Sequence, residues 1–288
     1  MERLIAETAG LGKPEWRSML RYVAGLHARS VHPAVDPFPL PWEEIGPGYF
    51  ASPAFGHWDI VHQILDVLPA EPEHAANQVI NDLANQTEDG LVPGSIWMKP
   101  HPPKWSTSCS HPPLWPVAVQ DHWALTGRLD LVSRCFEALV RQISWFESAR
   151  KAETEGFYYL DILTRSWESG VDEGVRFDDA PQRALACVDA TSHVYWLYEH
   201  AGRWAAMLGR DPSTFQKRAS EIGEFIRSEL FDPETGFFHD IWVVGKPGRR
   251  HSASRACGRW WSGRQLRKRQ TAPTLTEATM ARLGRAAV

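Results

Sequence analysis

The 288-residue chain has few cysteines and lacks the short motifs that mark common metal and nucleophile sites. Its four cysteines form no CxxC pair, which excludes a zinc knuckle or a thioredoxin-type redox site. The twelve histidines show no HExxH spacing, and neither a GxSxG elbow nor a glycine-rich phosphate loop is present. We therefore expect no cofactor and no metal at the functional site, while a structural cation in an acidic loop stays open.

Long apolar runs are also missing. No stretch of about 18 apolar residues could form a membrane span, and residues 1–5 (MERLI) lack the apolar core of a signal peptide. We expect a cytoplasmic protein with reduced cysteines and no membrane partner.

Helical periodicity dominates what is present, whereas strand patterns are scarce. Apolar residues recur at helical spacing over seven ranges, which are 2–28, 59–68, 72–86, 116–125, 131–148, 189–208 and 212–230. Long stretches rich in aromatic residues and proline separate these helices, and only 156–160 and 236–238 could form short ribbons. The pairing of helices without a 34-residue repeat predicts an all-α fold, an (α/α)6 toroid rather than a solenoid. Twelve helices need more chain than is present, so we expect the toroid to be incomplete.

The last 43 residues differ in kind from the rest. Residues 246–288 contain eleven Lys or Arg and a single acidic residue, Glu277, whereas the chain as a whole has a net charge of −4. We therefore divide the chain into a helical domain, 1–245, and a basic tail, 246–288, that has almost no apolar periodicity. The tail is either a nucleic-acid-binding or disordered extension or the product of a shifted reading frame, and the abrupt change in composition favours the frameshift.

The most densely charged stretch is residues 167–179, WESGVDEGVRFDD. Gly170 and Gly174 interrupt it and it has no regular periodicity, so we expect a loop. Carboxylates, an arginine and aromatic residues gathered in one loop suit acid–base chemistry. The alternative is a solvated acidic turn.

The order of residues in this loop resembles a motif of inverting glycoside hydrolases with an (α/α)6 barrel, W-E-S-G-x-D-x-x-x-R-[WF]-D. Mannosylglycerate and glucosylglycerate hydrolases and processing α-glucosidases carry it, and trehalases are more distant relatives. Four other stretches resemble further motifs of these enzymes in the same order, namely 56–59 (GHWD), 89–93 (DGLVP), 110–114 (SHPPL) and 234–240 (ETGFFHD). The resemblance covers about residues 40 to 243.

The resemblance implies roles for several residues. Asp172 would be the general acid that protonates the glycosidic oxygen. Trp58 and Asp59 would line the subsite of the cleaved sugar, and Trp167 would form a second aromatic wall. Arg176 would bind sugar hydroxyls or hold the acid loop in shape through a carboxylate.

Each role has a simpler alternative. Asp59 and Trp58 could cap and staple the helix that begins there, and Trp167 could be an ordinary core residue. Arg176 could merely pair with Asp178 or its neighbour.

Neighbouring carboxylates are expected to raise the pKa of the acid, as a general acid requires. Glu168, Glu173 and Asp178 are the candidates. His111 stands where the family has glutamine, so substrate preference could differ.

The second carboxylate of an inverting site is missing from the matched region. Inverting enzymes hold a base about 6.5–9.5 Å from the acid to activate water. The family's base lies beyond the matched residues, and Glu277 has no matching context. We therefore expect glycoside hydrolysis of an α-glucoside or α-mannoside, impaired in this chain.

Two other classes of function remain. The fourteen tryptophans would suit a non-catalytic carbohydrate-binding protein with a tryptophan-lined cleft. A helical scaffold whose tail binds nucleic acid ranks last, because the helical part is acidic and has no nucleic-acid motif.

Overall fold

The computed structural model describes residues 2–8, 13–46, 53–99, 104–164, 166–171, 175–178 and 180–244. The predicted boundary at residue 245 and the basic tail lie outside these ranges. Among the described helices, none is both long and apolar enough to cross a bilayer.

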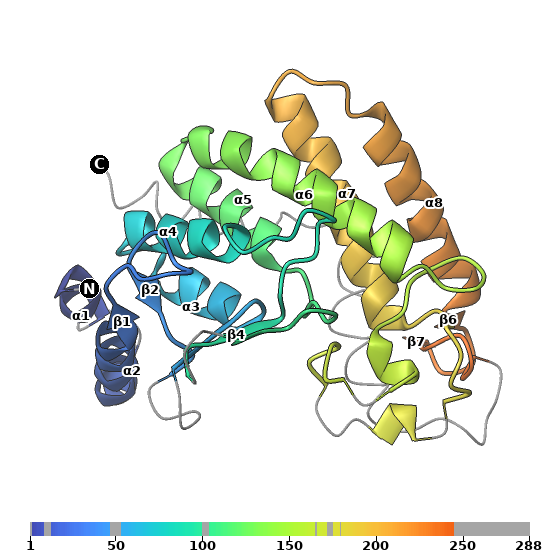
Figure 1. Cartoon of the computed structure of the whole chain (residues 1–288), viewed down its shortest axis with the longest axis horizontal. Coiled ribbons are helices and arrows are strands. Elements are labelled where there is room, and N and C mark those ends of the chain that lie inside the picture. Colours follow the sequence, from blue (N-terminus) through green and yellow to red (C-terminus); the bar gives the residue numbers. More distant parts are fainter. Residues whose placement is uncertain are drawn as a thin grey trace.

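The described residues contain eight α-helices that form four consecutive contacting pairs, and these follow one another in an arc (Figure 1). The pairs are α1 (Glu2–Thr8) with α2 (Arg17–Ser30), α3 (Asp59–Val67) with α4 (Pro72–Leu83), α5 (Trp115–Thr126) with α6 (Asp130–Ala149), and α7 (Val188–Met207) with α8 (Ser213–Glu229). Contacts also join α4 to α5 and α6 to α7, so the later pairs form one continuous layer. The predicted all-α architecture is confirmed. The single predicted helix over 2–28 is wrong, because a short 3-10 turn, η1 (Pro14–Trp16), precedes α2.

Apolar spacing explains why these segments are helices. In α6, Leu131, Cys135, Leu139 and Ile143 follow one another every four residues and are at most 5% exposed. This stripe faces the interior between α5 and α7. Gly127, with φ +69°, ends α5 and turns the chain towards α6.

In the described part of the chain, short strands lie in the connections between helices and in the segment after α8. They form the antiparallel pair β1 (Val31–His32) with β2 (Trp42–Glu43), the sheet β3 (Ala54–Gly56), β4 (Ser95–Trp97) and β5 (Lys104–Trp105), and the pair β6 (Phe231–Asp232) with β7 (Phe237–Phe238). The ribbon predicted at 236–238 is thus confirmed. The ribbon predicted at 156–160 is wrong: within the described chain Phe157 makes a single bridge to Lys151, and the next segment is a 3-10 turn, η2 (Leu160–Ile162).

A chain of buried polar side chains crosses four elements of the core. The Nδ1 atom of His57, before α3, lies 2.7 Å from Oδ2 of Asp82 in α4. Its Nε2 atom lies 3.4 Å from the amide of Gln142 in α6, which accepts a hydrogen bond of 2.7 Å from the indole of Trp115 in α5. All four side chains are at most 2% exposed.

Candidate active site

Loops that are far apart in sequence meet on one side of the arc, below the helices in Figure 1. The backbone N–H of His57 donates to Gly94 O at 3.0 Å, and Gly94 N–H donates to Cys109 O at 2.9 Å. Pro93 and Ser110 form an antiparallel bridge. Three of the motifs, at 56–59, 89–93 and 110–114, are therefore joined by main-chain hydrogen bonds.

Glu168 connects the acidic loop to this group. Its carboxylate accepts two hydrogen bonds from Arg150, at 2.7 and 2.8 Å, and backbone hydrogen bonds from Ser110 at 3.0 Å and Leu160 at 2.6 Å. Arg150 also donates a short hydrogen bond to the carbonyl oxygen of Ser108. Glu168 is fully buried and its charge is balanced by Arg150. Its role in this geometry is to hold three loops together, which differs from the expected role of a free neighbouring charge.

Two tryptophans flank the glycine of the same loop. Gly170 has φ +68°, and a Cβ atom at this position would lie 2.4 Å from Cζ3 of Trp58. The Trp58 ring thus packs against the loop backbone, and only glycine permits this approach. Trp167 is 51% exposed and has φ +57°, which is rare for a bulky residue. Its exposure argues against core packing and is compatible with a ligand-facing wall.

His111 packs against Gly94, directly after the 89–93 motif. A Cβ atom on Gly94 would lie 2.7 Å from Cδ2 of His111. Burial, together with the nearby His57, lowers the pKa of His111 to about 4. At neutral pH the ring is uncharged and can both donate and accept a hydrogen bond, as a glutamine amide can.

The remaining predicted residues occupy different settings. Asp59 is the first residue of α3, and the N-cap position before it is Trp58, whose side chain makes no capping bond. Asp178 is exposed. Asp172 and Glu173 lie outside the described residues, between Val171 and the 3-10 turn η3 (Val175–Phe177).

Arg176, in η3, is 3% exposed and forms ion pairs with Asp189 and Asp240. The distance from its Nη1 atom to Oδ1 of Asp240 is 3.4 Å, and the same oxygen accepts the Val188 N–H at 2.9 Å. Burial raises the pKa of Asp240 to about 6, although Arg176 opposes that shift. This is the arrangement that the loop-holding alternative for Arg176 predicts.

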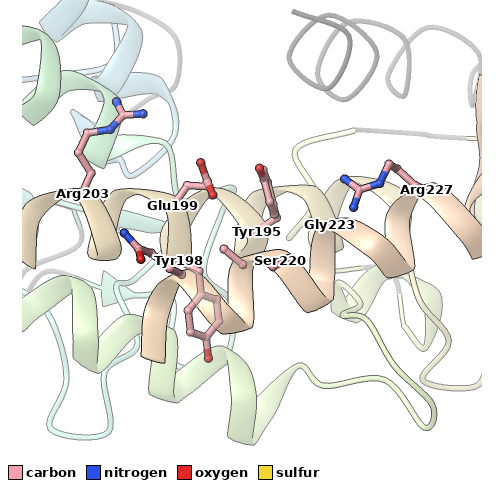
Figure 2. A pocket seen from close by; sticks show the side chains of 9 residues that line it. Tyr195, Tyr198, Glu199, Arg203, Ser220, Gly223 and Arg227 are labelled. Atoms are coloured by element: carbon pink, nitrogen blue, oxygen red, sulfur yellow. The ribbon is translucent and has the colours of Figure 1, made fainter. Parts of the chain in front are cut away.

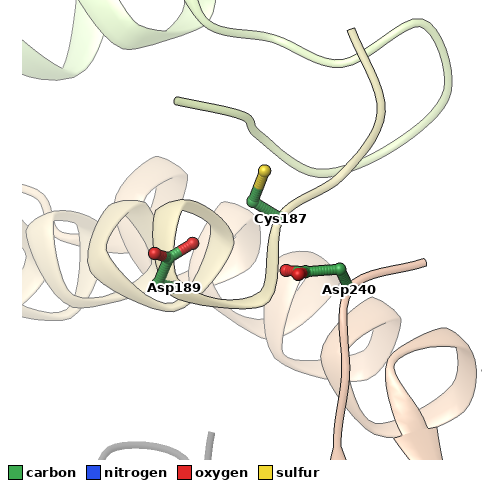
Figure 3. A group of neighbouring side chains, drawn as sticks. All are labelled: Cys187, Asp189 and Asp240. Carbon is green, nitrogen blue, oxygen red and sulfur yellow. The ribbon is translucent and has the colours of Figure 1, made fainter. Parts of the chain in front are cut away.

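Cys187, Asp189 and Asp240 lie close enough together to suggest a metal site, with one ligand atom of each within 4.8 Å of the others (Figure 3). Arg176 pairs with both of these carboxylates, so a cationic group is already in place. Burial also raises the pKa of the Cys187 thiol well above its ordinary value, which disfavours the thiolate that would bind a metal. The cluster therefore fits an arginine better than an ion.

A groove of about 500 Å³ lies elsewhere, along the seam between α7 and α8 (Figure 2). Tyr195, Glu199 and Arg203 of α7 and Gly223 and Arg227 of α8 line it. None of the residues predicted for the site is among its lining, so this groove is separate from the loop cluster.

Sequence reasoning missed several residues that shape the site. Arg150, Asp161, Asp189 and Asp240 were given no role, although Asp240 stands in one of the matched motifs. Asp161 accepts the Ser169 N–H at 2.9 Å, and burial raises its pKa. Arg150 gave no usable signal, because an arginine at the end of a long helix is often solvated.

Comparison with known protein families agrees with the resemblance to glycoside hydrolases. The model of the mannosylglycerate hydrolase MGH1-like glycoside hydrolase domain matches residues 53–272. The chain belongs to this family. The match includes every loop of the candidate site and runs past residue 244 into the basic segment.

Individual relatives agree with the family. Mannosylglycerate hydrolases MGH2 and MGH1 of Selaginella moellendorffii are each 26% identical over 160 residues. The chain spans about a third of the length of these relatives, since the alignment covers 47% of this chain and 32% of each of them.

Solved structures share the fold at low identity. The GH63 mannosylglycerate hydrolase from Thermus thermophilus, in complex with glucose, gives a TM-score of 0.61 at 15% identity, covering 88% of this chain and 78% of that chain. Neutral trehalase Nth1 from Saccharomyces cerevisiae gives 0.57 at 18% identity, covering 77% and 53%. The chain therefore shares the (α/α)6 toroid fold predicted from the sequence, and the described residues form four of its helix pairs.

Proposed function

We propose that this chain carries the acid half of a glycoside hydrolase site that cleaves an α-linked glucoside or mannoside with inversion. The observation that carries the proposal is the meeting of the motifs through specific contacts, of which Glu168 to Ser110 N–H and Trp58 to Gly170 are two. Family membership gives the reaction class. The substrates proposed are of the mannosylglycerate, glucosylglycerate or trehalose type, because relatives and structural neighbours bear the names of such hydrolases.

In the proposed reaction Asp172 donates its proton to the glycosidic oxygen as the bond from that oxygen to C1 breaks. Water attacks C1 from the opposite face and gives up a proton to bulk solvent, which inverts the configuration and leaves a β-sugar. Trp58 and Trp167 supply apolar faces for the sugar ring, and neutral His111 and Asp59 supply hydrogen-bonding groups. Glu168, Arg150 and Arg176 keep the loop in shape.

We further propose that turnover by this chain is impaired, because no carboxylate in the matched motifs has been assigned the role of base. A nucleophile that needs no deprotonation would bypass that defect. Azide is such an anion: its terminal nitrogen would bond to C1 as the leaving oxygen takes the proton of Asp172. The expected product is a β-glycosyl azide.

The test measures cleavage of mannosylglycerate, glucosylglycerate and trehalose by proton NMR, with and without azide. We expect slow cleavage in buffer, faster cleavage with azide and a β-configured first product. Asp172→Asn should lose both activities and keep sugar binding, whereas Glu229→Gln, an exposed carboxylate on α8, should retain both. An Asp172→Asn chain as active as the wild type would refute the assignment of the acid.

A non-catalytic carbohydrate-binding protein is the second candidate. The half-exposed Trp167 favours it, since an aromatic wall binds a sugar without any catalytic base. This function predicts binding by calorimetry that is unchanged in Asp172→Asn, together with no cleavage even in azide.

A further inference from the structure

Three charged side chains from separate segments meet beside the turn that follows Asp172 in the chain. Arg176 belongs to η3, Asp189 to the first turn of α7, and Asp240 to the segment after β7. Their exposures are 3%, 6% and 0%. We call this group the arginine clamp.

The clamp ties a loop to a rigid support. Asp240 accepts hydrogen-bonding contacts from Arg176 at 3.4 Å and from Val188 N–H at 2.9 Å, so it bridges the turn and the start of α7. Helix α7 runs for 20 residues and packs against both α6 and α8. An arginine fork held by two carboxylates has its plane and position fixed, which a single ion pair does not achieve.

The clamp is close to the proposed acid along the chain. Asp172 precedes Arg176 by four residues, so their Cα atoms are at most about 14 Å apart. Displacing a reacting group by about 1 Å can reduce a rate by roughly a hundredfold. A buried ion cluster, in contrast, is often no more stabilising than apolar side chains of the same size. Holding the turn in place is therefore the better explanation for the cluster.

We propose that Asp189 and Asp240 are positioning residues that act through Arg176 to hold the proposed general acid in place. This inference rests on the proposed function. It assigns to both aspartates a part in the reaction without contact with the sugar.

The first experiment needs no enzymatic activity. Amide hydrogen exchange of the folded chain is followed by mass spectrometry in peptides that cover η3 and the first turn of α7. Arg176→Ala and Asp189→Asn should speed exchange there about tenfold or more, because the turn loses its anchor. Millimolar guanidinium should restore protection in Arg176→Ala by filling the vacated position. The control is Arg210→Ala, which removes an exposed pair with Glu137 on other elements.

The second experiment measures azide-assisted cleavage in the same variants. We expect kcat to fall about tenfold to a hundredfold with KM nearly unchanged, and guanidinium to recover kcat in Arg176→Ala. Faster exchange in η3 and the first turn of α7 while kcat stays at the wild-type value would overturn the positioning role. Unaltered exchange in all clamp variants would overturn the anchoring itself.

Failure of the proposed function has a different signature. The wild-type chain would then cleave no glycoside even with azide, whereas the clamp variants would still exchange faster in η3 and the first turn of α7. The two inferences are therefore tested separately.

Discussion

Replacing Arg150 by methionine tests the loop junction most directly. Glu168 would keep its hydrogen bonds from Ser110 N–H and Leu160 N–H but lose both bonds from the guanidinium. Methionine retains contact with the Trp145 ring, over which the guanidinium now lies at 4.7 Å. The change therefore removes the charge and hydrogen bonds while leaving most of the packing.

The expected loss of stability is large. Leaving one member of a buried pair without its partner costs about 3–5 kcal/mol. The lost hydrogen bonds to Ser108 O and Ala149 O add about 1 kcal/mol each. For a chain of this size the melting temperature should fall by roughly 2–4 °C per kcal/mol.

Urea unfolding followed by tryptophan fluorescence gives the free energy of unfolding. Adding Glu168→Gln to Arg150→Met should recover part of the loss, because no uncompensated charge is then buried. Arg183→Met, which removes an exposed pair with Glu153, should leave the urea midpoint unchanged. A loss below about 1 kcal/mol in Arg150→Met would refute the reasoning, since Glu168 would then tolerate burial without its partner.

Three further predictions concern pH and backbone shape. The pKa of Asp240 is raised from 3.8 to about 6 in the folded state. Its contribution to the free energy of unfolding is therefore fully present below pH 3.8 and is lost as pH rises through about 6. Unfolding titrations should show a fall of about 3 kcal/mol across this range in the wild type, and Asp240→Asn should remove it. The pH dependence expected from His111 runs the other way, because its pKa is lowered from 6.5 to about 4. Its contribution to the free energy of unfolding is present above pH 6.5 and is lost as pH falls through about 4, and His111→Gln should remove that loss in the same titrations. Gly170→Ala should destabilise the chain and weaken sugar binding measured by calorimetry, because the new Cβ would lie 2.4 Å from Trp58. Gly209→Ala, at φ +69° with open space around it, isolates the backbone strain, and an equal effect of the two alanines would contradict the proposed contact.

Periodicity was enough to predict most of the fold. The apolar spacing of α3, α4, α6 and α8 gave helix limits within a few residues of those observed, because each of these helices buries mainly one face. The limits of α7 were equally close, although α7 is buried on most of its surface. The error at 156–160 has a clear cause: Tyr159 and Phe157 are buried individually, so their aromatic clustering reflects core packing and not strand pairing. Aromatic composition alone does not distinguish these cases.

The motifs of the candidate site could be identified in the sequence, whereas the partners of their charged residues could not. Order along the chain identified the five motifs, and their meeting in space agrees with that prediction. The partners of Glu168 and Arg176 could not be read from the sequence, since Arg150 and Asp240 are 18 and 64 residues away from them. Charged residues are rarely buried unless they are paired, and the sequence does not show which distant residue will be the partner.

The polar chain from Asp82 through His57 and Gln142 to Trp115 has a consequence for how the helices find their alignment. An apolar stripe repeats every turn, so sliding one helix by about 5.4 Å would still bury apolar side chains. The same slide would leave a histidine, a carboxylate and an amide in the core without partners, at a cost of about 1–3 kcal/mol each. These four side chains thus act as a check on register, because misaligned packings of α3 to α6 would leave them without partners.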